Sequence, residues 1–198
     1  AVGLEGFGNP DGFLERQVGR WRKQLDSYAK YENWPGPNSL NHVDEIGAWL
    51  NKTRPPTFKP GILHGDYHIK NVLYDRKSPR IAAIIDWELT TIGAPMIDLG
   101  WLLATWRGKN GEIDGAPFVI EPWQGFPDSS ELVDYYAAKT GEDVTFAYWY
   151  AVFACYKLAL LLEGTYARSC AGKIDTQTGA KFHGNAENLL RKATGWIS

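Results

Sequence analysis

The feature that most constrains this chain is the stretch from Ile62 to Leu99, in which short apolar runs alternate with polar loops. Three of these runs, at residues 62–64, 72–74 and 80–85, have the length and composition of short strands, and residues 76–79 have the composition of a turn. Asp66 and Asp86 follow the first and the last run. Carboxylates at the ends of buried strands indicate a chemical role, so we expect the functional site here.

Helices are expected on both sides of this stretch. The spacing of apolar residues and the helix-start signals predict helices over about 11–28, 39–50, 96–106 and 128–139, a long aromatic helix from about 146 towards 170, and a last helix over about 183–193. Asp128 and Glu131 form a predicted capping box, and Gly141 a predicted stop. One cluster of strands among many helices predicts an α+β class that is mostly helical.

Composition limits the classes of partner. The chain has 198 residues, 44% of them hydrophobic, and a formal net charge of -2. Such a chain buries a sizeable core but carries no broad cationic surface, so we expect a small-molecule ligand and no nucleic acid. Residues 146–162 are apolar except for Lys157, yet they are too short and too rich in Tyr and Trp for a membrane span, which predicts a buried helix.

The two cysteines bear on the cellular compartment. Cys155 and Cys170 lie 15 residues apart in one predicted helical region, which separates them by roughly 22 Å along the helix axis. A disulfide between them is excluded at that distance. Free thiols fit a reducing compartment, so we expect a cytoplasmic protein.

The predicted hairpin brings polar residues together. A turn centred between residues 78 and 79 would place Val72 opposite Ile85, and Asn71 opposite Asp86. Asp66, at the start of the preceding loop, can fold back towards the same point. Carboxylate and amide oxygens are hard ligands that suit Mg2+ and bind zinc poorly.

The spacing within the loop favours one chemistry. Asp66 and Asn71 keep the five-residue interval of the kinase catalytic loop, where the Asp accepts the proton of the substrate hydroxyl and the Asn holds a metal ion. A second hypothesis is a two-metal hydrolase built from His64, Asp66, His68 and Asp86, but it leaves Asn71 unexplained. We expect His68 to be an exposed loop histidine, with a substrate or metal contact as the alternative.

Three motifs in this stretch carry a family resemblance. They are His64-Gly65-Asp66-Tyr67-His68-Ile69-Lys70-Asn71, Ile85-Asp86-Trp87-Glu88 and Gly93-Ala94-Pro95-Met96-Ile97-Asp98-Leu99. In order and spacing they closely resemble the aminoglycoside phosphotransferase and choline kinase family of small-molecule kinases. The flanking helices, including the stretch GFLERQVGRW, are similar to kinase-like domains related to those fused to acyl-CoA dehydrogenases.

The resemblance implies a protein-kinase-like C-terminal lobe with a small central β-hairpin, and a role for each motif residue. It implies that Asp66 is the catalytic base and that Asn71 and Asp86 bind Mg2+ at the phosphates of the co-substrate ATP. It implies that His64 braces the loop and that Asp98 is a buried acceptor for backbone amides of the loop. Asp98 would therefore support the site without taking part in the chemistry.

The chain also departs from the family. Members carry an N-terminal nucleotide-binding lobe with a phosphate-covering loop and a lysine, whereas residues 1–60 here are predicted to form loops and helices. Residues 1–198 therefore resemble the C-terminal lobe alone of an ATP-dependent phosphotransferase that acts on a hydroxyl group. We expect such a chain to turn over poorly by itself, and a non-catalytic kinase-like binding module remains the alternative.

The acidic residues bear on the acceptor. A polycationic antibiotic would require a strongly acidic cleft, whereas the acidic residues of the C-terminal half are scattered along the sequence. We therefore expect a less charged hydroxylated small molecule, such as an acyl derivative.

Overall fold

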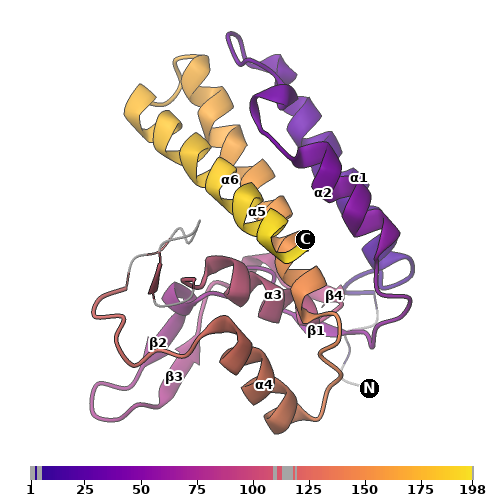
Figure 1. Ribbon diagram of the computed structural model, residues 1–198, viewed down its shortest axis with the longest axis vertical. Helices are drawn as coiled ribbons and strands as arrows, with labels where there is room; N and C mark the ends of the chain where they lie inside the picture. Colours follow the sequence, from indigo (N-terminus) through magenta and orange to yellow (C-terminus); the bar gives the residue numbers. More distant parts are fainter. Residues whose placement is uncertain (1–2, 4–5, 109–110, 113–117, 119, 198) are drawn as a thin grey trace.

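The computed structural model describes residues 3, 6–108, 111–112, 118 and 120–197. Helices dominate it (Figure 1), and in the sequence the strands come between α2 and α3. The described helices are α1 (Phe13–Asp26), α2 (Val43–Lys52), α3 (Met96–Thr105), α4 (Ser129–Thr140), α5 (Ala147–Cys170) and α6 (Thr176–Ile197). The strands are β1 (Gly61–Leu63), β2 (Val72–Tyr74), β3 (Ile81–Ile84) and β4 (Thr91–Gly93). The predicted α+β, mostly helical class is confirmed.

The core is organised around α5. This helix packs against α6, α3, α1 and α2, and in Figure 1 α5 and α6 run side by side as the two longest helices. Its apolar residues occur on all sides, as expected for a helix buried all round. Phe153, Tyr156 and Leu160 are almost completely buried. Residues 146–162 thus lie in a core segment, and in the described part of the chain no helix has the length and apolarity required to cross a bilayer.

The contact between α3 and α5 is exceptionally close at one glycine. A Cβ atom added to Gly100 would lie 2.4 Å from the backbone oxygen of Tyr150. A side chain at position 100 would therefore push the two helices apart. Since Asp98 lies in the first turn of α3, this packing fixes the place from which its carboxylate reaches the strands.

The strands form two antiparallel pairs. β1 pairs with β4, with Ile62 opposite Ile92, and β2 pairs with β3. The apolar run of β1 is recognisable in the sequence, whereas its partner β4 was not predicted. Because β1 and β4 are neighbours, the chain leaves and re-enters the helical body at nearly the same place, and the β2–β3 hairpin projects beyond this point (Figure 1).

The predicted register of the hairpin is wrong by one residue. Val72 lies opposite Ile84, and the carbonyl of Asn71 accepts a hydrogen bond from the amide of Ile85 at 2.9 Å. The reason lies at the turn, where the carboxylate of Asp75 accepts a hydrogen bond from the amide of Lys77 and starts the turn early. An irregularity between Leu73 and Tyr74 compensates only part of the resulting shift in strand register.

The helix predictions hold with two changes of extent. The capping box of Asp128 and Glu131 is present, and α4 ends at Gly141 in the left-handed conformation. The second helix starts at Val43, later than expected, while α6 starts at Thr176, well before His183. Gly179 in this early part of α6 lets the helix approach Ser169 of α5 closely, so packing overrides its weak helix propensity.

The expectation for the two cysteines can also be compared with the structure. Cys155 and Cys170 both lie on α5 and are not joined by a disulfide, as predicted. Residues 107–127, which connect two of the predicted helices, fall partly outside the described residues.

Candidate functional site

Two backbone amides that precede Asp66 are held by the side chain of Asp98. Its carboxylate oxygens accept hydrogen bonds from the amides of His64 at 2.7 Å and of Gly65 at 2.9 Å. Burial raises the pKa of Asp98, while the two amide hydrogen bonds and the nearby charge of Lys157 act in the opposite direction. The interaction expected of Asp98 is therefore present, and it fixes the start of the loop to α3.

The side chain of His64 joins the two strand pairs. Its Nδ1 accepts a hydrogen bond from the amide of Asp66 at 3.3 Å, and its Nε2 lies 2.8 Å from the carbonyl of Ile85, to which it donates. His64 is buried, and its ring lies 4.8 Å from the ring of Trp87. Both ring nitrogens are thus engaged with backbone groups, which removes His64 from the ligand set of the hydrolase hypothesis.

Gly65 provides a conformation that the loop requires. Its φ of 88° lies in the region that side chains rarely adopt, and an added Cβ would lie 2.6 Å from the carbonyl oxygen of Leu89. The chain can therefore reverse directly before Asp66 only with glycine at this position.

Asp66 and Asn71 contact each other directly. The side-chain amide of Asn71 donates to the backbone carbonyl of Asp66 at 3.0 Å and approaches its carboxylate at 3.3 Å. Asn71 is buried, whereas the carboxylate of Asp66 is 27% exposed. Since the nitrogen of Asn71 is used in this way, its Oδ1 oxygen is the atom available to a cation.

The carboxylate of Asp66 is kept ionised by its surroundings. Burial raises the pKa of Asp66, but the hydrogen bond and the charge interaction with His68 and the charge of Lys157 outweigh burial, so that the pKa is lowered. Nε2 of His68 lies 3.5 Å from the carboxylate. His68 is 8% exposed, so our expectation of an exposed loop histidine is wrong. Its ring packs on Phe118 at 4.3 Å, which explains the burial.

Asp86 lies two residues after the end of β3 and has a left-handed backbone, with φ 67° and ψ 54°. Asp tolerates this conformation better than most residues. The indole of Trp87 donates to the carbonyl of Ile84 at 2.8 Å and closes the turn around Asp86. Asp86 is exposed at the same end of the hairpin as Asn71, although the two are not directly opposite, as the corrected register requires.

A cavity of about 200 Å3 opens beside Asp66 and His68. Its walls are mainly apolar and come from α3, α5, α6 and Phe118. The polar side chains in the wall are Thr105, Lys181 and Asn185. Sequence reasoning missed these wall residues because they come from three helices and a loop that are far apart in the sequence.

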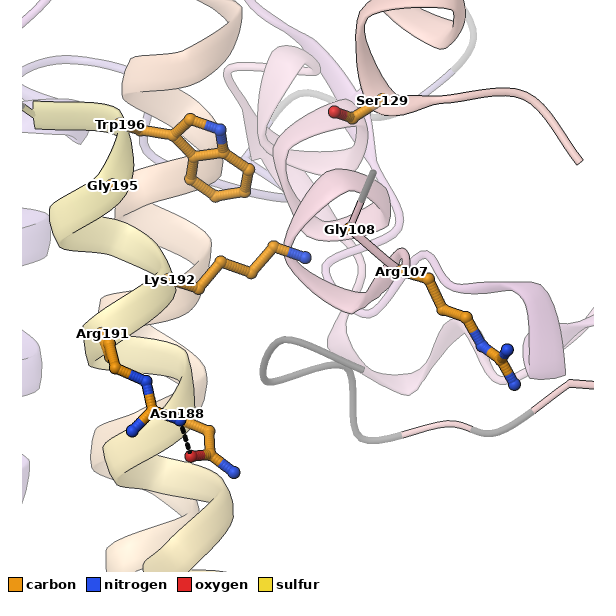
Figure 2. A pocket seen from close by; sticks show the side chains of 8 residues that line it. All are labelled: Arg107, Gly108, Ser129, Asn188, Arg191, Lys192, Gly195 and Trp196. Carbon is orange, nitrogen blue, oxygen red and sulfur yellow. Dashed lines mark hydrogen bonds between the residues drawn. The ribbon is translucent and has the colours of Figure 1, made fainter. Parts of the chain in front are cut away.

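A second pocket, of about 430 Å3, lies between α6 and the segment that follows α3 (Figure 2). It contains three basic side chains, but they are turned to protein groups. The guanidinium of Arg107 points away and binds Glu121 at 2.6 Å, Lys192 donates to the carbonyl of Trp106, and Arg191 donates to Asn188. Among the described residues that line this pocket, none belongs to the three sequence motifs.

Sequence reasoning also missed Lys157 on α5. Its ammonium donates to the carbonyl of Gly65 at 3.1 Å, although the two residues are far apart in the sequence. The available signal was a single charge inside an otherwise apolar helical run. That pattern indicates a buried charge but does not identify its partner.

The model of the phosphotransferase enzyme family matches residues 1–124. Acyl-CoA dehydrogenase family member 11 of Gallus gallus is 27% identical over 97% of this chain, and the probable acyl-CoA dehydrogenase IBR3 of Arabidopsis thaliana is 28% identical over all of it. The chain spans about a quarter of the length of each of these relatives.

A solved structure supports the same relationship. A Ralstonia eutropha JMP134 protein assigned as an aminoglycoside phosphotransferase superposes with a TM-score of 0.75 and 27% identity, over 98% of this chain and 59% of that one. The fold, the three motifs and the family match agree, and this chain belongs to the phosphotransferase enzyme family.

Proposed function

We propose that residues 1–198 are the C-terminal lobe of an ATP-dependent phosphotransferase that transfers the γ-phosphoryl group to a hydroxyl of a small molecule. The observation that carries this proposal is the contact between Asp66 and Asn71, in a loop that Asp98 holds by two backbone amides. This contact leaves the carboxylate of Asp66 facing a cavity and an oxygen of Asn71 available for a cation.

In this proposal Asp66 orients the acceptor hydroxyl and accepts its proton as the oxygen attacks the γ-phosphorus. The lowered pKa means that the carboxylate is ionised at neutral pH, as this role requires. A carboxylate is nevertheless a weak base towards an alcohol, whose proton is far less acidic. Orientation of the hydroxyl is therefore the larger part of its contribution.

The donor set fits Mg2+. Asn71 offers an amide oxygen and Asp86 an exposed carboxylate, and Mg2+ in nucleotide sites takes one or two protein oxygens, with phosphates and water as its other ligands. In the described residues no group of three His, Cys, Asp or Glu side chains forms a metal centre, so a site completed by ATP suits this chain better than an all-protein cage. When bound, Mg2+ supplies neutralisation of the phosphate charge.

The cavity beside Asp66 favours an acceptor with an apolar body. Its walls include Trp101, Leu158, Leu162 and Phe182, and Asp66 is the one acidic side chain among the described residues that line it. A polycation would find little compensation there, because its charges would be desolvated against aromatic and aliphatic groups. A hydroxylated acceptor of low positive charge, such as an acyl derivative, fits these walls better.

The proposed second lobe would cover an exposed apolar surface on the hairpin. Leu73, Tyr74 and Ile81 of the hairpin and Trp87 and Leu89 beyond Asp86 are all about half exposed. Such a cluster is unusual for a surface that faces only water. A nucleotide-binding lobe outside residues 1–198 would bury these side chains and close the phosphate site.

The test is made in the full-length protein that contains these residues. Asp66→Asn and Asp86→Asn should each abolish turnover of ATP and acceptor while the protein stays folded, because both carboxylates are at least partly exposed. Asp75→Asn, in the hairpin turn, is the matched control and should keep activity. Near wild-type turnover by either site variant would refute the assignment, and an unvaried protein that binds ATP without turnover would favour the non-catalytic module.

A further inference from the structure

Lys157 is a buried cation that contacts the loop containing Asp66. It lies in the middle of α5 and is 9% exposed. Its Nζ donates to the carbonyl of Gly65 at 3.1 Å, and the same ammonium lies 4.4 Å from the ring centre of Trp101 and 5.2 Å from that of Trp21. One donor is thus used by the loop, and aromatic faces surround the rest of the charge.

The positive charge of Lys157 is stabilised by the nearby carboxylates of Asp66 and Asp98. Burial lowers the pKa of Lys157 to about 8, while Asp66 and Asp98 act in the opposite direction and Arg20 adds to the lowering. The group is therefore mostly protonated at neutral pH. A methionine of similar length could fill the same space without the cost of desolvating a charge, so packing alone does not require a lysine here.

Gly65, the residue that precedes Asp66, is held through both of its backbone polar groups. Asp98 of α3 accepts the hydrogen bond of the Gly65 amide, and Lys157 of α5 donates to the Gly65 carbonyl. α3 and α5 are themselves packed closely at Gly100. Both ends of the glycine are therefore fixed to one rigid helix pair, and the direction in which Asp66 leaves the chain is fixed with them.

We propose that Lys157 is a positioning residue, which holds the Gly65–Asp66 peptide in its productive orientation and places a positive charge behind the Asp66 carboxylate. This inference rests on the proposed function for its catalytic consequence, but its structural half stands by itself. The neighbouring Leu158 lines the cavity beside Asp66. α5 thus holds the catalytic loop with one residue and shapes the acceptor site with the next.

The structural half is tested by hydrogen exchange on the 198-residue chain. Lys157→Met should increase the exchange rate of the amides at Gly65 and Asp66 at least tenfold, while the melting temperature stays unchanged or rises because a buried charge is removed. Glu163→Gln is the control, since it removes a fully buried charge from the same helix at a site that contacts Trp34, Ser39 and His183. It should leave the Gly65 and Asp66 amides unchanged.

The catalytic half is tested in the full-length protein, with MgATP and water as the acceptor. Lys157→Met should lower kcat for ATP hydrolysis by about 10- to 100-fold and change the KM for MgATP less than threefold, because a misplaced base affects the transition state more than nucleotide binding. Lys157→Gln, which keeps a donor, should show the smaller loss of kcat.

The outcomes are distinguishable. Unchanged exchange at Gly65 and Asp66 in Lys157→Met would overturn the inference, as would an unchanged kcat in an active enzyme. If the Gly65 and Asp66 amides exchange faster in Lys157→Met but the unvaried full-length protein turns over no ATP, the contact between Lys157 and Gly65 would be supported and the proposed function refuted.

Discussion

The carboxylate of Asp98 offers a quantitative test of how the loop before Asp66 is held. In Asp98→Asn, one oxygen can still accept the amide of His64, but the new NH2 group faces the amide of Gly65, to which the carboxylate now bonds at 2.9 Å. A hydrogen bond to a charged acceptor contributes about 1.5 to 3 kcal/mol, and an orphaned buried amide costs about 1 to 3 kcal/mol. These are two descriptions of the same loss, so they are not added.

Part of this loss is offset in the variant. Burial raises the pKa of Asp98, so the native carboxylate carries a desolvation cost at neutral pH that the amide avoids. We therefore expect Asp98→Asn to lower the free energy of unfolding by about 2 kcal/mol, which corresponds to roughly 4 to 8 °C in a domain of this size. Asp98→Ala, which leaves both amides without an acceptor, should lose more.

Urea denaturation gives the free energy, and amide exchange at His64 and Gly65 gives its location. Asp143→Asn is the control, because Asp143 also accepts a backbone amide, that of Thr145, but in an exposed loop. The urea midpoint of Asp143→Asn should stay close to that of the unvaried chain. A fully stable Asp98→Asn chain with the Gly65 amide still protected would refute the reasoning, since it would show that the carboxylate is not the acceptor that holds the loop.

Two further predictions concern stability. Because the pKa of Lys157 is about 8 when folded against 10.5 as the reference, the unfolded chain binds more protons between these values, and the free energy of unfolding should rise from pH 8 to pH 10. Above pH 10 the free energy of unfolding should fall, since burial raises the pKa of Tyr150 and Tyr156 from 10.0 to about 12. Urea titrations between pH 8 and pH 12 test both the rise and the fall. An identical rise in Lys157→Met would contradict the assignment of the rise to Lys157. Gly100→Ala should destabilise the chain by about 1 to 3 kcal/mol or prevent folding, whereas Gly19→Ala, on the open surface of α1, should not lower the midpoint.

The parts of the fold that could be predicted are those with a local signal. The capping box at Asp128 and the apolar run of α5 each depend on residues that are close together in the sequence, and the structure contains both. The same holds for the motif residues. The resemblance of its motif to the small-molecule kinase family implies that Asp98 accepts backbone amides of the loop, and in the structure it accepts those of His64 and Gly65.

The parts that could not be predicted depend on contacts between distant segments. The start of α6 at Thr176 is hidden by Gly179, whose weak helix propensity is overridden by packing against α5. The register of the hairpin depends on one side-chain contact, that of Asp75 with Lys77. The contact of Lys157 with Gly65 joins residues that are 92 positions apart in the sequence. A periodic pattern shows which residues are buried but not which of them meet.

The pairing of β1 with β4 has a consequence for how the chain can vary. Gly61 lies opposite Gly93, so the segment between them begins and ends at one point of the helical body. A change in length at the tip of the β2–β3 hairpin therefore displaces neither α2 nor α3, and closing a longer loop adds only a small entropic cost. The hairpin tip can accept inserted residues, such as an epitope or a label, while the distances around Asp66 stay as they are.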